Sequence, residues 1–376
     1  MKQLDVIVAG GGAMGTAATW QLAKRGLRVA CLDRFAPPHA LGSSHGSTRI
    51  IREAYFEHPQ YVPLVRRAFT LWDELAQQVA VLPLYFLTGG AYIGSANSAL
   101  LRGVLASVRT HAIPHEVLEP DALAQRYPAL KAELGMTAIV EERAGFVHVA
   151  AGIRAMRAQA VAAGAQLEDH EPVEHFEVGA NDVTVRTARE TYRADRLVVA
   201  VGAWIRELVP QLARIFSVQR QVTVWCAARG AGVAPNEAPV TIWELESGET
   251  FYTIPDEGDG FKIGVHYGGA LTNVGDIDRK VSDAEQQKGR ELLARYIPPA
   301  AGEIRNASVC MYTNTPDLHF AIDWLPGANE RVLIVSPCSG HGFKFAPAIG
   351  EVVGQMIVDG RSEFDTSPFR LTRFAN

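Results

Sequence analysis

A glycine-rich turn near the start of the chain constrains its fold more than any other feature. Gly10, Gly12 and Gly15 follow the apolar run 6–9 and open a helix-forming segment over about 13–24. Gly10 permits a tight turn from strand to helix, Gly12 lets the backbone approach a pyrophosphate, and Gly15 allows the helix to pack closely on the strand. The spacing in this context predicts a βαβ unit that binds a dinucleotide.

An acidic residue completes this pattern. Asp33 closes the next apolar run, 29–32, about 20 residues after the glycines. There a carboxylate can accept hydrogen bonds from both ribose hydroxyls of an adenosine, and it disfavours a 2'-phosphate. The helix N-terminus points its partial positive charge at the phosphates. The alternative is a glycine turn in an ordinary βαβ unit, with Asp33 capping the strand end.

Length and composition exclude several classes of protein. The chain has 376 residues, which suggests about two domains, and its net charge of −5 leaves no basic surplus for nucleic-acid binding. There is no apolar run of 18 residues, and the glycine motif begins too early to leave room for a signal peptide. We therefore expect a soluble, cytoplasmic protein without a membrane partner. The four scattered cysteines and the histidine spacing predict neither a disulfide framework nor a metal site.

The hydrophobic pattern along the chain indicates two discontinuous domains. Helical spacing begins at about Tyr61, short strand-like runs follow Pro83, and from about Gly145 the chain returns to helix and buried strand. The strand of residues 197–201 ends in a glycine turn that we expect to pass close to the cofactor. The pattern over residues 214–311 predicts strands and one helix, which begins at the capping box Ser282-x-x-Glu285. We expect a cofactor domain formed by 1–83, 145–213 and 317–376, and a second domain formed by 84–144 and 214–316.

Three basic residues are candidates for chemistry. Arg49 and Arg52 are either solvated or phosphate-binding cations, or Arg52 holds a substrate carboxylate in bidentate fashion. Lys262 lies in a strand-like segment between apolar residues. It is either an edge-strand charge facing solvent or a functional cation beside the cofactor.

Two further segments, 310–317 and 339–345, attract attention by their position. Taken alone, Cys310 is most simply a small buried hydrophobe. The segment 339–345 is either a plain loop or a place where Lys344 and the following helix stabilise negative charge on a reduced cofactor.

Together these segments resemble the family of monomeric sarcosine oxidases and N-methyl-L-tryptophan oxidases. The similarity runs nearly end to end and is carried by the glycine motif with Asp33 and by 42–52, 262–266, 310–313 and 339–345. The terminal segment 364–371 is similar to the N-methyltryptophan enzymes. Each motif alone is weak, whereas the combination is specific.

The resemblance implies an α/β protein, α+β overall. Its Rossmann-like FAD-binding domain is of the glutathione-reductase type, and its substrate domain is built on an antiparallel sheet. It also implies FAD attached through a thioether to Cys310, in a monomeric oxidase. Such an enzyme oxidises the C–N bond of a secondary, N-methyl amino acid to an imine, which water hydrolyses, and reduces oxygen to hydrogen peroxide.

The resemblance further implies roles for individual residues. Catalysis would involve Lys262, which activates oxygen, together with His266, Arg49 and Tyr312. Substrate binding would involve Arg52, Lys344, Tyr252 and Trp243. The cofactor would contact Gly10, Gly12, Gly15, Asp33, Arg34, Ser43, Thr48, Val173, Gly202, Trp204, Cys310, Gly340, Gly342, Phe343 and Lys344.

Three positions, Leu318, Cys338 and Trp243, depart from the family pattern and bear on the substrate rather than on the reaction. Trp243 either crowds out a bulky side chain or stacks on an aromatic one. Two other functions stay open. One is a dehydrogenase that passes electrons to another protein, and the other is an FAD-binding subunit without turnover.

Overall fold

The computed structural model describes residues 3–79 and 83–375. Residues 1–2, 80–82 and 376, which the predicted domain ranges include, lie outside the described residues. No helix within the described ranges is long and apolar enough to cross a membrane.

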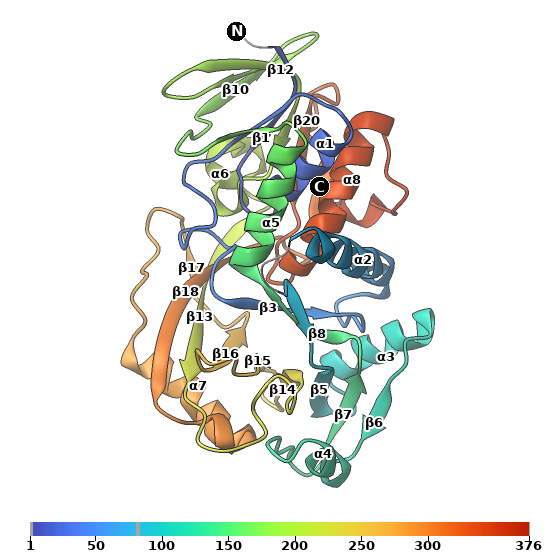
Figure 1. Ribbon diagram of the computed structural model, residues 1–376, viewed down its shortest axis with the longest axis vertical. Helices are drawn as coiled ribbons and strands as arrows, with labels where there is room; N and C mark the ends of the chain where they lie inside the picture. Colours follow the sequence, from blue (N-terminus) through green and yellow to red (C-terminus); the bar gives the residue numbers. More distant parts are fainter. Residues whose placement is uncertain (1–2, 80–82, 376) are drawn as a thin grey trace.

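An eight-stranded sheet, here the first sheet, lies at one end of the molecule (Figure 1). Its central strands run parallel, as expected for a dinucleotide-binding fold. In spatial order its main path is β10 (His175–Val178), β11 (Val183–Arg186), β12 (Thr191–Val199), β1 (Gln3–Ala9), β2 (Val29–Leu32) and β9 (Gln166–Glu168). Strand β20 (Val332–Ser336) pairs with β12, and β19 (Ala321–Trp324) pairs with β20.

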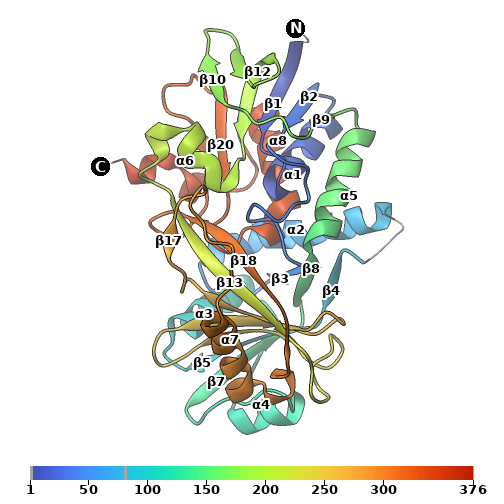
Figure 2. The ribbon, with the colours of Figure 1, turned by 90° about the vertical axis from the view of Figure 1, so that its left-hand side faces the viewer.

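A nine-stranded second sheet lies at the other end (Figure 2). Its main path is β17 (Leu271–Thr272), β13 (Ser217–Cys226), β16 (Phe261–His266), β15 (Thr250–Ile254), β14 (Val240–Glu244), β5 (Gly90–Ser95), β7 (Met136–Glu141) and β6 (Glu116–Leu118). The long strand β18 (Ile304–Asn314) pairs with β13. The expectation of an antiparallel sheet needs one correction, because β14 and β5 pair in parallel. These two strands come from chain segments far apart, so no tight hairpin dictates their direction.

A small third sheet joins the two ends. It consists of β3 (Thr48–Arg52), β8 (Ala144–His148) and β4 (Tyr85–Leu87), all paired antiparallel. Both candidate arginines, Arg49 and Arg52, belong to β3. The chain segments that form each large sheet support the predicted division into two domains. The division itself stays a prediction.

Helices pack against both large sheets, and several of them pack on one another. The helices are α1 (Ala13–Lys24), α2 (Val62–Gln78), α3 (Ala99–His111), α4 (Pro120–Arg126), α5 (Val149–Ala162), α6 (Ile205–Leu208), α7 (Asp283–Tyr296) and α8 (Ala346–Asp359). The capping box at Ser282 is present at the start of α7. Helices α3 and α4 lie in a stretch for which short strands and turns were expected, although α3 buries Leu100, Leu101, Val104 and Val108 at helical spacing.

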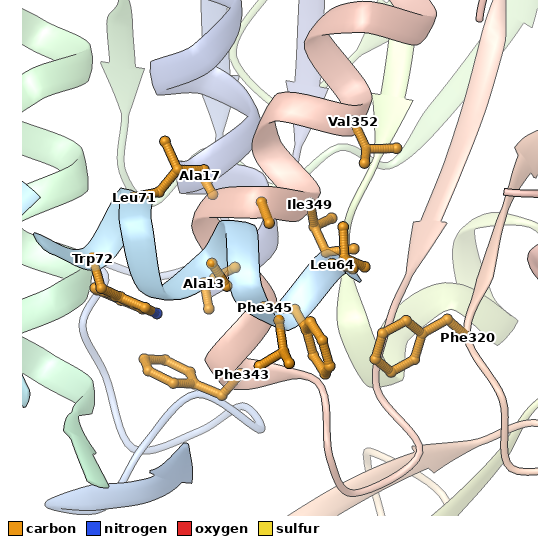
Figure 3. Packing of buried hydrophobic residues seen from close by; sticks show 14 of the residues in the cluster. Ala13, Ala17, Leu64, Leu71, Trp72, Phe320, Phe343, Phe345, Ile349 and Val352 are labelled. Carbon is orange, nitrogen blue, oxygen red and sulfur yellow. The ribbon is translucent and has the colours of Figure 1, made fainter. Parts of the chain in front are cut away.

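Small residues allow α1 and α8 to approach closely. A Cβ added at Gly350 would lie 2.4 Å from the Ala17 carbonyl oxygen, so only glycine fits there. Figure 3 shows Ala13 and Ala17 among the apolar side chains of α2 and α8. Because α8 begins two residues after Lys344, this packing fixes where that residue lies.

Candidate active site

One long cavity of about 460 Å³ draws its lining from both large sheets and from β3. Its lining includes the glycine turn and Asp33 from the first sheet, and His266 and Tyr312 from the second. Segments far apart in the chain therefore form one site.

The glycine turn has the geometry that the sequence predicts. Gly10 has φ +93°, and a Cβ there would lie 2.6 Å from the Ala200 carbonyl oxygen. A Cβ at Gly15 would lie 1.7 Å from the Gly10 carbonyl oxygen, so this residue packs the helix on the strand and does not line the cavity. At Gly12 a Cβ would meet only Ser44 Oγ at 3.7 Å, which leaves open space for a ligand.

Asp33 lies at the same end of the cavity. Its Oδ2 accepts a hydrogen bond from the Gly11 amide at 2.6 Å, and its Oδ1 accepts one from the Phe35 amide at 2.7 Å. Burial raises the pKa of Asp33, and these two amides oppose the rise. Each oxygen keeps a lone pair for a ribose hydroxyl.

Three buried polar atoms in the cavity lining have no hydrogen-bond partner within the described residues. They are Ser43 Oγ, Gln221 Nε2 and Ser336 Oγ. A buried polar atom without a partner is costly, so such atoms indicate a polar ligand between them. Together with the glycine turn and Asp33, they fit a dinucleotide.

Most of the other expected cofactor-binding residues also line this cavity. They are Arg34, Val173, Gly202, Trp204, Cys310, Gly340, Gly342, Phe343 and Lys344. Thr48 is the exception, since its carbonyl oxygen is occupied by Arg49 and Lys262 and the residue lies outside the lining. The expected contact of Thr48 with the cofactor stays a prediction that the cavity lining does not support.

The opposite end of the cavity holds an aromatic and imidazole cluster. His266 Nδ1 lies 3.0 Å from the Tyr312 hydroxyl, and Tyr252 lies beside them in the lining. Burial lowers the pKa of His266 to about 3. The imidazole is therefore neutral at physiological pH.

Arg52 enters this end of the cavity from β3. Its Nη2 bonds to Glu57 Oε1 and Oε2 at 2.7 and 2.6 Å, and its guanidinium stacks on the Tyr55 and Phe56 rings at 4.0 and 4.5 Å. Although burial opposes it, the Arg52 charge lowers the pKa of Glu57 to about 2. An incoming carboxylate must therefore share Arg52 with Glu57 or displace it.

Lys344 is connected to Arg52 by Tyr55, which lies in the turn that follows Arg52. Its Nζ donates to the His341 carbonyl oxygen at 2.6 Å and lies 3.4 Å from the Tyr55 hydroxyl. The backbone of Lys344 is held in turn, because Trp72 Nε1 donates to its carbonyl oxygen at 2.9 Å. Burial lowers the pKa of Lys344 well below its usual range, and the Arg52 charge adds to this.

Arg49 and Cys310 meet in the cavity wall. Arg49 Nη2 lies 3.5 Å from Cys310 Sγ and 3.2 Å from the Ser43 carbonyl oxygen. The sequence gives β3 and β18 no local relation, so only the tertiary fold brings these two residues together.

Lys262 is buried rather than directed to solvent. It is 1% exposed, its Nζ donates to the Thr48 carbonyl oxygen at 2.7 Å, and it lies 5.1 Å from the centre of the Trp225 ring. Burial lowers its pKa well below the usual range, and the Arg49 charge adds to this. Lys262 does not itself line the cavity, whereas Arg49 does.

The expectation that Trp243 contacts the substrate is wrong. Trp243 is fully buried, packs on Phe251 and Tyr296 at 5.6 and 5.1 Å between ring centres, and donates to Thr241 Oγ1 at 2.7 Å. Successive side chains of a strand point to opposite faces, and here the neighbouring Ile242 lines the cavity.

Several lining residues carry no sequence signal of their own. Phe56 and Glu57 follow Arg52 in a turn, and Gln221 and Ile242 lie on strands. His341 lies within the expected segment 339–345 but had no assigned role. Its Nδ1 lies 2.7 Å from the Tyr55 hydroxyl, and burial lowers its pKa to about 4.

Two residues that depart from the family pattern also have a place in this region. Cys338 lines the cavity, and its Sγ accepts the Thr313 amide at 3.3 Å. Leu318 lies outside the lining and presents its carbonyl oxygen to His341 Nε2 at 3.1 Å.

Known proteins resemble this chain along almost its whole length. Residues 5–356 match the family model DAO, described as FAD dependent oxidoreductase. Monomeric sarcosine oxidase from Streptomyces avermitilis is 37% identical over 376 residues, covering 99% of this chain and 98% of that protein. N-methyl-L-tryptophan oxidase from Salmonella agona is 36% identical over 373 residues, covering 99% of each. The resemblance predicted from the motifs is thereby confirmed.

A solved structure shows the same fold. The open form of NikD, described as an unusual amino acid oxidase essential for nikkomycin biosynthesis, aligns with a TM-score of 0.85. The alignment covers 98% of each chain at 23% identity.

Proposed function

Because the chain belongs to the FAD-dependent oxidoreductase family, we propose that it is an oxidase acting on the CH–NH group of a secondary, N-methyl amino acid. The substrate loses two electrons and two hydrogens to form an imine, which water hydrolyses, and oxygen is reduced to hydrogen peroxide. The observation that carries the proposal is the convergence of Arg52, Lys344, His266 and Tyr312 on the cavity that also contains Asp33.

FAD would be held along the cavity by the glycine turn, Asp33 and the unpartnered polar atoms of Ser43 and Ser336. When bound, FAD supplies a two-electron acceptor that oxygen can reoxidise. Cys310 is the proposed thioether link. The bond from Sγ to the flavin methyl carbon replaces one hydrogen on each partner, and oxygen accepts the two electrons released.

Arg52 and Lys344 would bind the substrate carboxylate. Both are buried, and Tyr55 connects them, since its ring stacks on Arg52 and its hydroxyl lies near Lys344 Nζ. Anchoring the carboxylate holds the reacting carbon in a fixed orientation, which can supply several kcal/mol of the rate enhancement. A bound carboxylate favours the charged form of Lys344, so this pair selects acids over plain amines.

His266 and Tyr312 would receive the amine. A neutral imidazole carries no positive charge that would repel a substrate arriving as an ammonium ion. Its Nδ1 already contacts the Tyr312 hydroxyl. These side chains also help to exclude water from the reacting carbon.

Arg49 and Lys262 would assist the reduction of oxygen. Oxygen reduction passes through the superoxide anion, and a positive charge fixed nearby lowers the barrier to forming it. Both side chains donate to the Thr48 carbonyl oxygen, so Lys262 lies behind Arg49, which lines the cavity.

The proposal is tested with purified protein and a panel of N-methyl and cyclic amino acids, with hydrogen peroxide as the readout. We expect stoichiometric peroxide and bleaching of the flavin colour when substrate is added without oxygen. Bleaching without peroxide on return of oxygen would favour a dehydrogenase that needs another acceptor. No bleaching with any amino acid would favour an FAD-binding subunit without turnover.

A further inference from the structure

A buried carboxyl group behind Arg52 has no part in the chemistry described above. Glu141 is the last residue of β7 and is 1% exposed. Both of its oxygens accept the Ala54 amide, at 3.1 and 3.0 Å, and Oε1 also accepts the Tyr92 hydroxyl. A buried carboxyl held by one amide and one hydroxyl is costly to keep, which calls for a reason.

The Ala54 residue links this carboxyl to the candidate substrate cation. Its amide donates to Glu141, and its carbonyl oxygen accepts Arg52 Nη1 at 3.0 Å. The next residue, Tyr55, places its ring 4.0 Å from the Arg52 guanidinium carbon and its hydroxyl 3.4 Å from Lys344 Nζ. The turn anchored by Glu141 therefore contacts both proposed carboxylate-binding cations.

We propose that Glu141 is a positioning residue, which fixes the turn at Ala54 and thereby sets the geometry and the electric field of Arg52 toward the substrate carboxylate. This inference rests on the proposed function, because it takes Arg52 as the carboxylate-binding residue.

The charge of Glu141 affects anion binding because Arg52 is already paired with one carboxylate, that of Glu57. The titratable groups that act on Glu141 are Tyr92 of β5, Arg52 of β3 and, in the turn, Glu53, whereas Glu57 pairs with Arg52. Glu53 is itself paired with Arg66 and Arg143. Burial raises the pKa of Glu141 to about 7. Above that pH an ionised Glu141 adds negative charge beside Arg52, so the affinity for an anion falls.

Two variants separate anchoring from charge. Glu141→Gln keeps an oxygen for the Ala54 amide and an NH₂ group for Tyr92, but it does not titrate. Glu141→Leu has a similar volume and loses both the anchor and the charge. Glu351→Gln is the matched control, since Glu351 is a buried carboxylate on α8 that pairs with Arg67.

The probe is butyrate, a carboxylate without an amine, whose own charge is constant from pH 6 to 9. Its dissociation constant from the holoenzyme is measured by the change in flavin absorbance. For the wild type and Glu351→Gln we expect the constant to rise several-fold as pH passes about 7, and for Glu141→Gln we expect it to stay flat. For Glu141→Leu we expect about tenfold weaker binding at pH 6, with KM for the amino acid raised and kcat changed by less than about twofold.

The outcomes are distinguishable. A pH dependence in Glu141→Gln equal to that of the wild type, or no butyrate binding to the wild type, overturns the inference. If Glu141→Leu fails to fold, the comparison of wild type with Glu141→Gln still decides. If butyrate behaves as expected but no amino acid bleaches the flavin, the proposed function fails and the anion site remains.

Discussion

Arg49 Nη2 lies 3.5 Å from Cys310 Sγ in the wall of the cavity. This contact directs the sulfur toward residues that line the cavity. The same sulfur lies 3.7 Å from the Ser43 carbonyl oxygen, whose residue also lines the cavity. This pair is the strongest local argument for a covalent link at Cys310.

The first prediction concerns that link. In the wild type we expect the yellow colour to remain with the protein after acid precipitation, and in Cys310→Ser we expect it to appear in the supernatant. Cys226→Ser is the control, because Cys226 is buried in the second sheet, away from the cavity lining. Colour released from the wild type, or retained by Cys310→Ser, would show that another residue forms the link or that none does.

The second prediction concerns oxygen. Lys262→Met removes a buried cation while keeping an unbranched side chain, so reoxidation of the flavin by oxygen should slow by about a hundredfold to a thousandfold. Reduction of the flavin by substrate without oxygen should change little, since Lys262 lies outside the cavity lining. Stopped-flow absorbance measures the two half-reactions separately. Equal slowing of both half-reactions would instead indicate a general disturbance of the site.

The third prediction concerns the substrate carboxylate. Arg52→Met removes a bidentate donor, so KM should rise by about 10-fold to 100-fold, the equivalent of about 1.5–3 kcal/mol for a charge-assisted hydrogen bond. The variant leaves Glu57 buried without its partner, which should also lower the stability by about 3–5 kcal/mol. Arg28→Met, at an exposed ion pair with Asp5, should alter neither quantity. An unchanged KM in a folded Arg52→Met protein would exclude Arg52 from substrate binding.

The fourth prediction uses two neighbouring residues on opposite faces of β14. Trp243→Ala should cost about 3–5 kcal/mol of stability, because the side chain is fully buried in the core of the second sheet. Ile242→Ala should instead change which amino acid side chains are accepted, because Ile242 lines the cavity. Urea unfolding and a substrate panel on both variants make the comparison. A shift in substrate preference in the conservative variant Trp243→Phe would show that Trp243 does contact the substrate.

The fifth prediction concerns pH. Burial lowers the pKa of His45 to about 4, of His266 to about 3 and of His341 to about 4. The unfolded chain therefore binds more protons than the folded one below pH about 6.5, and the stability falls as pH decreases from there. At pH 5 each histidine should cost about 1–2 kcal/mol relative to pH 7.

Denaturant unfolding at pH 7 and pH 5 measures this loss, and a substitution of His341 should reduce it. The same values imply that kcat has no acid limb from His266 between pH 5 and 7. An acid limb near pH 6 that disappears in His266→Asn would contradict the neutral imidazole.

Local chain geometry explains which parts of the site could be predicted from sequence. The glycine turn and Asp33 were predicted correctly because a tight turn, an open backbone and a strand end depend on residues close in the chain. The start of α2 and the capping box of α7 follow the same rule.

Side-chain direction and distant pairing could not be read in this way. Whether Ile242 or Trp243 faces the cavity depends on the register of β14 against β5 and β15, and a shift of one residue exchanges the two faces. Thr48 and Lys262 lie beside the cavity rather than in its lining because β3 and β16 meet there. The pairing of Arg52 with Glu57 and the anchoring of the same turn by Glu141 had no signal in the motifs.

The sequence by itself determined that the chain has a dinucleotide-binding turn and a set of residues typical of one oxidoreductase family, because those features are encoded in short spacings. Only the tertiary structure decided that Arg52, Lys344, His266 and Cys310 share one cavity. These residues lie on β3, β16, β18 and the short 3-10 helix before α8, and their proximity depends on how three sheets pack against each other.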